Sequence, residues 1–253
     1  MLHRPLIAGI AVLLLGSLPA VAWTPTSQRA IAEHAARLAP PDLYRQLARN
    51  RIPYLQGVND GFGERDPAAH SKNDDGTGRL DESINVAIEN AILAITSHQP
   101  FNEIAYRLGI VSHFVADANN PLNASQKDPA EGRYYADFLR YLEHAEPRVR
   151  IVFYGFRPNF NGRRDLPQLV SEALERSRGF YPAVGREYRR IRFASGIGGF
   201  DDLSSAFGVA SLSYSHAVSD IAEVLRYIWL EAGGIDTRRR IPLRGREVIQ
   251  LSD

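Results

Sequence analysis

The stretch from Leu108 to Ala124 (LGIVSHFVADANNPLNA) constrains the fold more than any other part of the chain. Its apolar residues recur at the spacing of one helix face, and His113 and Asp117 interrupt that face four residues apart. Residues at i and i+4 lie one turn apart on the same side of an α-helix, so the imidazole and the carboxylate can converge on one point. The pattern predicts a buried helix that ends before Pro121 and carries either two metal ligands or a hydrogen-bonded core pair.

The remainder of the chain has the pattern of further amphipathic helices, with no internal repeat. Helices are expected at 25–38, 43–50, 81–98, 134–146, 166–177, 181–191 and 203–232. A long loop rich in Gly, Asp and Asn is expected from Gly57 to Gly78, and a strand is possible only at 150–154. These features predict an all-α, single-domain, multi-helix bundle.

The first 22 residues have the pattern of a signal peptide. His3 and Arg4 precede an apolar run from Leu6 to Leu15, and 20–22 (Ala-Val-Ala) form a small-x-small cleavage site. The run is shorter than the roughly 20 residues that span a bilayer. We therefore expect a secreted or periplasmic protein that is cleaved near Ala22 and begins at Trp23.

Charge and cysteine content narrow the possible partners and metal ligands. The formal charge is +1 for 253 residues, and removal of 1–22 takes away Arg4 and leaves 29 basic and 29 acidic side chains. A neutral chain has no overall field that would attract nucleic acid or an anionic membrane. Cysteine is absent, so a transition-metal site would have to use His, Asp, Glu or the terminal amine.

Four further positions are candidate ligands. The free amine of Trp23 could lose its proton to a metal near neutral pH, because its pKa is about 7.7–8.0. His34 lies on the helix that begins just after Trp23, and Asp60 and His70 are the most ligand-like residues of the long loop. Taken singly, each has an ordinary alternative, as a half-buried histidine or a solvated loop residue.

As an ordered set, these residues make the sequence similar to the zinc-dependent phospholipase C family and its relatives, the single-strand-specific zinc nucleases. The similarity covers Trp23 to about Gly234, and its strongest part is LGIVSHFVADANNPLNAS. It implies a single helical domain at 23–234 with zinc ions in a cleft, followed by a polar tail at 235–253 that contains 238–240 (Arg-Arg-Arg).

Residue by residue, the resemblance implies two zinc ions. Trp23 and His34 would bind one ion, and the other ligands would bind the second, with one carboxylate bridging the two. The expected ligand set is Trp23, His34, Asp60, His70, His113 and the bridging Asp117, with Asp60 and Asp117 as the catalytic carboxylates.

The third zinc site of the family is where this chain departs from the pattern. Its ligand positions fall on Asn123, Tyr135 and Leu139, none of which is a good zinc ligand. Asp137, Glu143 and His144 are close enough in sequence to rebuild a site. His216 and Asp220 repeat the i, i+4 spacing and are expected to form a packed hydrogen-bonded pair.

The resemblance implies a secreted metal-dependent hydrolase of phosphoric esters. Phospholipid is the favoured substrate over nucleic acid, with peripheral membrane contact and no protein partner evident. The alternatives are a nuclease-like phosphodiesterase, a non-catalytic zinc-binding protein on the same scaffold, or a helical protein that binds no metal and whose histidines lie far apart.

Overall fold

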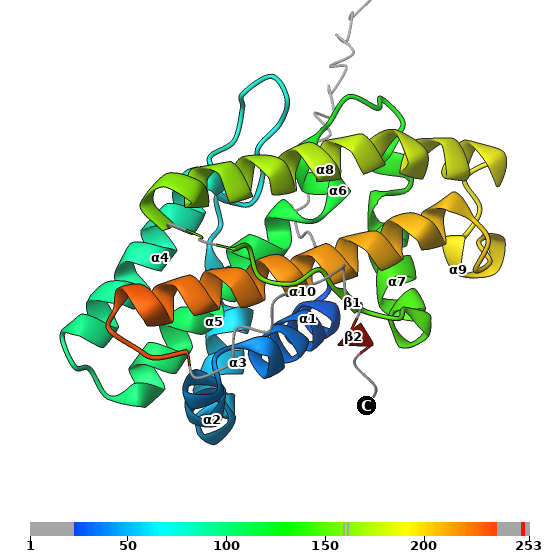
Figure 1. The fold of residues 1–253 in the computed structure, drawn as a ribbon. Helices are drawn as coiled ribbons and strands as arrows, with labels where there is room; N and C mark the ends of the chain where they lie inside the picture. The colour runs from blue at the N-terminus through cyan, green and yellow to red at the C-terminus, as the bar shows by residue number, and fades with distance from the viewer. Residues whose placement is uncertain (1–22, 159, 161, 237–248, 251–253) are drawn as a thin grey trace, which may run out of the picture.

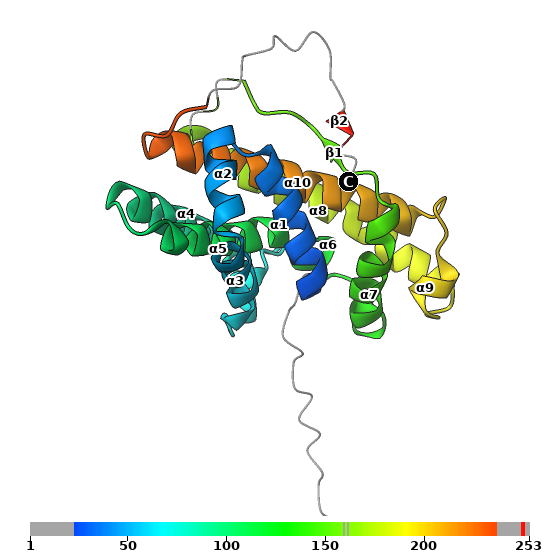
Figure 2. The ribbon, with the colours of Figure 1, turned by 90° about the horizontal axis from the view of Figure 1, so that it is seen from below.

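The computed structural model describes residues 23–158, 160, 162–236 and 249–250. Figures 1 and 2 show long helices packed across one another, with little strand. The α-helices are α1 (Pro25–Leu38), α2 (Pro41–Arg49), α3 (Arg51–Asp60), α4 (Leu80–Thr96), α5 (Phe101–Ala118), α6 (Pro121–Ala124), α7 (Tyr135–Ala145), α8 (Gly162–Arg190), α9 (Gly196–Gly199) and α10 (Ser205–Glu231). Four 3-10 turns, η1 (Gly61–Gly63), η2 (Pro67–His70), η3 (Glu131–Arg133) and η4 (Glu146–Arg148), and two short strands, β1 (Val152–Phe153) and β2 (Ile249–Gln250), complete the description. The prediction of an all-α chain is confirmed.

The central helix is α5, as the sequence predicts. Its C-terminal half is buried on every side, from Val111 through Ala118, and α1, α3, α4, α8 and α10 all contact it. Asn119 ends the helix, and Asn120 caps the short α6 by accepting a hydrogen bond from the backbone of Leu122. Two candidate ligands are therefore held on the fully buried half of this helix.

The backbones of α3 and α5 touch where two glycines meet. A Cβ on Gly109 would lie 2.1 Å from the carbonyl oxygen of Tyr54, and one on Gly57 would lie 1.9 Å from the carbonyl oxygen of Tyr106. Such approaches exclude any side chain at either position. The crossing brings the end of α3 directly against the face of α5 that carries His113.

Helix α3 is longer than the sequence patterns suggest. The stretch from Gly57 to Asp60, expected to begin the long loop, is the last turn of α3, and Pro53 lies inside its first turn. Proline is tolerated there because first-turn N–H groups have no partner within the helix. Similarly, 166–177 and 181–191 join in one helix, α8, which continues through Pro182.

Side chains of α10, the last long helix, accept hydrogen bonds from the backbone of the segment that follows η4. Backbone N–H groups of Val152, Tyr154 and Arg157 donate to Ser215 Oγ, Ser219 Oγ and Glu223 Oε2 of α10, at 3.1, 3.2 and 2.6 Å. The expected short strand is present as β1, and its other edge pairs with β2, part of the predicted polar tail. The expected signal peptide at 1–22 and the Arg-rich 238–240 lie outside the described residues.

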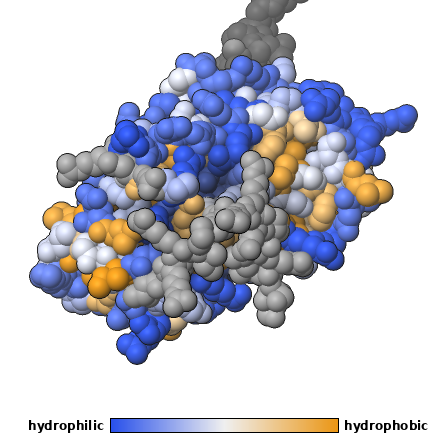
Figure 3. Space-filling view, in the orientation of Figure 1, coloured by the Kyte–Doolittle hydropathy of each residue, from blue (hydrophilic) through white to orange (hydrophobic). Residues whose placement is uncertain are grey.

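The visible face of Figure 3 has apolar side chains at both ends, with hydrophilic ones between them. The exposed large apolar side chains include Ile197 and Leu203 near α9, and Leu93 and Leu230 in α4 and α10. No helix in the described part of the chain is long and apolar enough to cross a membrane.

The glycine crossing generates a stability prediction. Gly109→Ala should lower the free energy of unfolding by about 1–3 kcal/mol, because the added methyl group would force α3 and α5 apart. The matched control is Gly179→Ala in α8, where a Cβ meets nothing within 4 Å; this change should raise stability by about 0.5–1 kcal/mol. Denaturant unfolding of both variants measures the difference, and equal effects would contradict the close crossing.

Candidate metal centre

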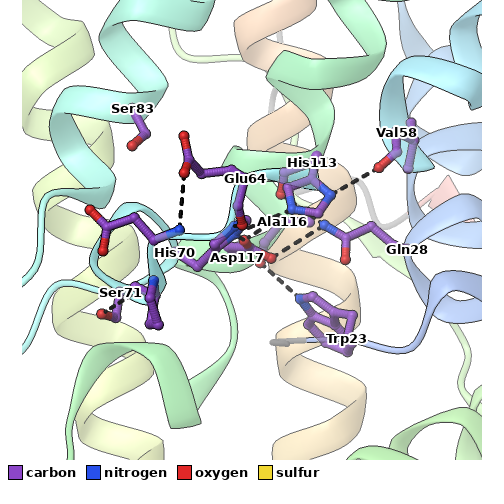
Figure 4. Close-up of polar contacts among 12 residues, drawn as sticks. Trp23, Gln28, Val58, Glu64, His70, Ser71, Ser83, His113, Ala116 and Asp117 are labelled. Atoms are coloured by element: carbon purple, nitrogen blue, oxygen red, sulfur yellow. Dashed lines mark hydrogen bonds and ion pairs between the residues drawn. The ribbon is translucent and has the colours of Figure 1, made fainter. Parts of the chain in front are cut away.

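Three predicted ligands meet in the interior. His113 and Asp117 come from α5, and His70 comes from η2 at the end of the loop that precedes α4. His70 Nδ1 lies 2.7 Å from Asp117 Oδ2, and His113 Nε2 lies 3.4 Å from both of these atoms. Figure 4 shows the three side chains converging between the helices. Among the described residues, this is the one group of His, Asp and Glu side chains that could hold a metal ion.

The separations fit the coordination sphere of a single ion. In a tetrahedral zinc site with bonds of about 2.0–2.2 Å, neighbouring ligand atoms lie about 3.3–3.5 Å apart. The two separations from His113 Nε2 already have this length. The shorter separation of His70 from Asp117 is that of a charge-assisted hydrogen bond. The donor set of two imidazoles and one carboxylate therefore fits zinc.

The outer nitrogen of each imidazole faces a backbone carbonyl. His113 Nδ1 lies 2.9 Å from the carbonyl oxygen of Val58, and His70 Nε2 lies 3.1 Å from that of Glu64. A carbonyl oxygen only accepts, so each outer nitrogen carries the hydrogen and donates. In His113 this arrangement leaves the Nε2 lone pair directed at the cluster. Metal-ligating histidines are held in this way by their second nitrogen.

The cluster is enclosed by aromatic rings and almost inaccessible to solvent. His70, His113 and Asp117 are 5%, 0% and 1% exposed. The ring of Phe62 meets His113 edge-on at 4.6 Å between centroids, and Phe114 lies 5.4 Å from His70. A Cβ on Gly61 would come within 2.3 Å of the His113 ring. The enclosure strengthens every electrostatic interaction inside it.

Charge on the cluster is shared between His70 and Asp117. Burial alone would raise the pKa of Asp117, but the neighbouring imidazoles of His113 and His70 outweigh it and lower that pKa below its usual value. Burial likewise opposes charge on His70, while the hydrogen bond and charge of Asp117 raise the pKa of His70. The raised pKa of His70 and the lowered pKa of Asp117 both favour an ion pair across their 2.7 Å contact when no metal ion is bound.

Gln28 of α1, which the sequence analysis did not select, is the fourth polar side chain of the site. Its Nε2 donates to the carbonyl oxygen of His113 at 2.9 Å and to Asp117 Oδ1 at 3.2 Å. It is 0% exposed. A signal was available: Gln28 lies at helical spacing from Ile31 and Ala35 on the apolar face of α1, where a polar residue needs a partner.

Trp23 reaches the same helix through its ring. Its indole N–H donates to the carbonyl oxygen of Ala116 at 2.9 Å, next to Asp117, and its ring lies 4.9 Å from that of Tyr214. The predicted start of the mature chain therefore packs against the helix that carries the central carboxylate.

Two predicted ligands lie outside the cluster. His34 is six residues after Gln28, about 240° further around the helix, so it faces away when Gln28 faces Asp117. Asp60 is two residues after Val58, about 200° around α3; it is exposed and accepts a hydrogen bond from Tyr106 OH at 3.2 Å. Among the described residues, neither side chain joins the group formed by His70, His113 and Asp117, so metal binding by His34 or Asp60 stays a prediction.

The positions at which the resemblance would place a third zinc site are part of the core. Leu139 is buried, Tyr135 packs against the core, and Asn123 is 0% exposed. Asp137, one candidate for a rebuilt site, accepts hydrogen bonds from Tyr188 OH and from the backbone of Gly196, and a second candidate, His144, is exposed. No metal cluster forms from these residues or Glu143 within the described part of the chain.

The expected pairing of His216 with Asp220 is also wrong. Asp220 accepts hydrogen bonds from Asn119 at 3.1 Å and Arg176 at 2.5 Å, because both donors reach it from the neighbouring helices. His216 instead stacks on Tyr154, with 4.4 Å between ring centroids. Burial and the nearby Arg176 lower the pKa of His216 to about 4.

No known protein family matches this sequence, and no significant match is found among curated proteins. The assignment of chemistry therefore depends on the residues themselves.

The environment of His216 predicts an acid-sensitive contribution to stability. Its pKa is depressed in the folded state, so its contribution is present above the unfolded pKa of about 6.5 and is lost as the pH falls towards 4. His216→Phe keeps a ring against Tyr154 and cannot be protonated. Between pH 7 and 4.5 the native chain should lose about 1 kcal/mol more than this variant, a figure reduced for the partial exposure of the ring. Parallel pH dependences in urea unfolding would contradict it.

Proposed function

We propose that this chain is a metal-dependent hydrolase of phosphoric esters, similar in fold type and chemistry to the zinc-dependent phospholipases C. The observation that carries the proposal is the three-ligand cluster of His70, His113 and Asp117. Catalytic zinc sites use three protein ligands and keep a position for water, whereas structural sites are closed by four.

Each residue of the site has a definite task in this proposal. A divalent ion bound here would supply a Lewis acid and a water of lowered pKa. The carbonyl groups of Val58 and Glu64 orient the two imidazoles so that their inner nitrogens face the ion. Phe62 and Phe114 exclude bulk water from around the cluster.

The proposed substrate class follows from the resemblance. The full chain carries 30 basic and 29 acidic side chains, so it has no overall field that would attract a polyanionic nucleic acid. The preference for a lipid head group comes from the resemblance. Export after cleavage near Ala22 would place the enzyme outside the cytoplasm, where it would meet membrane surfaces peripherally. Phosphodiester cleavage in phospholipid head groups is therefore the proposed activity.

A second candidate is a non-catalytic protein that zinc stabilises. The near-complete burial of His70, His113 and Asp117 favours it, because a substrate phosphate must reach the ion. A surface groove lined by Ile88, Leu93, Leu166 and Tyr227 contains none of these ligands. Zinc would then contribute stability only, by binding the folded state far more tightly than the unfolded one.

Hydrolysis by the purified mature chain distinguishes the two. With zinc bound, residues 23–253 should cleave bis(p-nitrophenyl) phosphate and release head groups from phosphatidylcholine vesicles faster than they cut single-stranded DNA. His113→Ala should lose the ion and at least 100-fold of the rate, because it removes a ligand on the central helix. His144→Ala, which removes an exposed histidine from α7, is the control and should keep both.

Thermal unfolding completes the test. Full zinc occupancy with no turnover on any of the three substrates would favour the stabilising role. In that case, removal of zinc by a chelator should lower stability by about 4 kcal/mol at a thousandfold excess of zinc over its Kd. Failure to bind zinc at all would contradict both candidates.

A further inference from the structure

We infer that Asp117 is shared between one metal ion and the carboxamide of Gln28, so that the centre holds a single ion and requires no free amine at Trp23. This rests on the metal centre of the proposed function and replaces the two-ion arrangement implied by the sequence resemblance. The two oxygens of Asp117 carry the argument, because they have different partners.

One oxygen faces the metal-binding side. Asp117 Oδ2 lies against His70 Nδ1 and His113 Nε2, at 2.7 and 3.4 Å. The other oxygen, Oδ1, accepts a hydrogen bond from Gln28 Nε2 at 3.2 Å. A carboxylate that bridges two ions through its two oxygens would need both directed at cations. Here the second position is taken by an N–H donor.

The orientation of the Gln28 amide follows from its neighbours. Both atoms that it faces, Asp117 Oδ1 and the carbonyl oxygen of His113, only accept hydrogen bonds. A rotated amide would place its own oxygen against two other oxygens and lose both hydrogen bonds. Gln28 therefore presents its NH₂ group to Asp117, and an NH₂ group of an amide does not coordinate a cation.

The other ligands of a second ion are also not in place. His34 lies about 240° around α1 from Gln28, and within the described part of the chain the cluster of possible ligand atoms contains no third imidazole. Trp23 is anchored through its indole N–H to Ala116 and through its ring to Tyr214. Neither contact depends on whether another residue precedes Trp23.

Gln28 is consequently a positioning residue. By holding Oδ1, it directs Oδ2 towards the two imidazoles, in the way that outer-shell hydrogen bonds orient ligating carboxylates. Its carboxamide is neutral, so one carboxylate charge remains for the one bound ion. Tyr214 donates to Ser27 at 2.8 Å and fixes the adjacent turn of α1.

Metal stoichiometry of the mature chain tests the inference. Elemental analysis after dialysis against dilute zinc should give one ion per chain, both for residues 23–253 and for the same chain with Gly-Ser added before Trp23. His34→Ala should also bind one ion. Two ions in the mature chain, falling to one on extension or in His34→Ala, would overturn the inference and leave the metal centre itself standing. No bound ion in any form would overturn both.

The role of Gln28 is measured separately. Gln28→Leu fills similar volume without donors and should bind one ion about tenfold more weakly, with a changed visible spectrum of the cobalt-substituted site. Gln28→Glu, of the same shape, keeps the packing but replaces the donors by acceptors, and should shift the same spectrum. A zinc affinity and cobalt spectrum that both variants leave unchanged would overturn the positioning role, whatever happens to stability.

Discussion

The contact between the backbones of α3 and α5 is the constraint on which the centre depends. Gly57 and Gly109 have no side chains, so the two helices approach until the carbonyl oxygen of Val58 accepts a hydrogen bond from His113. That bond determines which nitrogen of His113 carries its hydrogen, and so directs the other towards Asp117. A methyl group at the crossing would move the acceptor, and the imidazole would lose its orientation. Packing and chemistry are thus coupled through two glycines.

The part of the site that lies on one helix could be predicted from sequence, and the part that depends on helix rotation could not. His113 and Asp117 interrupt an apolar face at i and i+4, which fixes their relation within α5. Asp60 and His70 are predicted as the most ligand-like residues of the long loop, and of these two only His70 joins the described cluster. His34 is predicted from its place on the first helix and from the resemblance, whereas Gln28 is not among the predicted residues. Only the position of α1 against α5 decides which face of α1 is turned inward.

The missed helix turn has a similar cause. Gly57, Asn59 and Asp60 have the composition of a loop, and Pro53 precedes them. In the structure Gly57 is a contact residue inside α3, and Pro53 lies where its missing N–H costs nothing. Local preference was overridden by the close crossing, which a single sequence does not reveal. Because this turn is helical, Asp60 lies about 200° around α3 from the inward-facing Val58 and is exposed at the surface.

A buried carboxylate needs a cation, and this requirement connects the fold with the function. Asp117 is 1% exposed, and one amide donor cannot balance its charge at such depth. The protein supplies the balance through His70, whose proton lies between the two side chains. A divalent ion would take the place of that proton, with His113 already oriented to complete its coordination. The interior therefore offers a place for a cation beside Asp117, which either the proton of His70 or a metal ion could take.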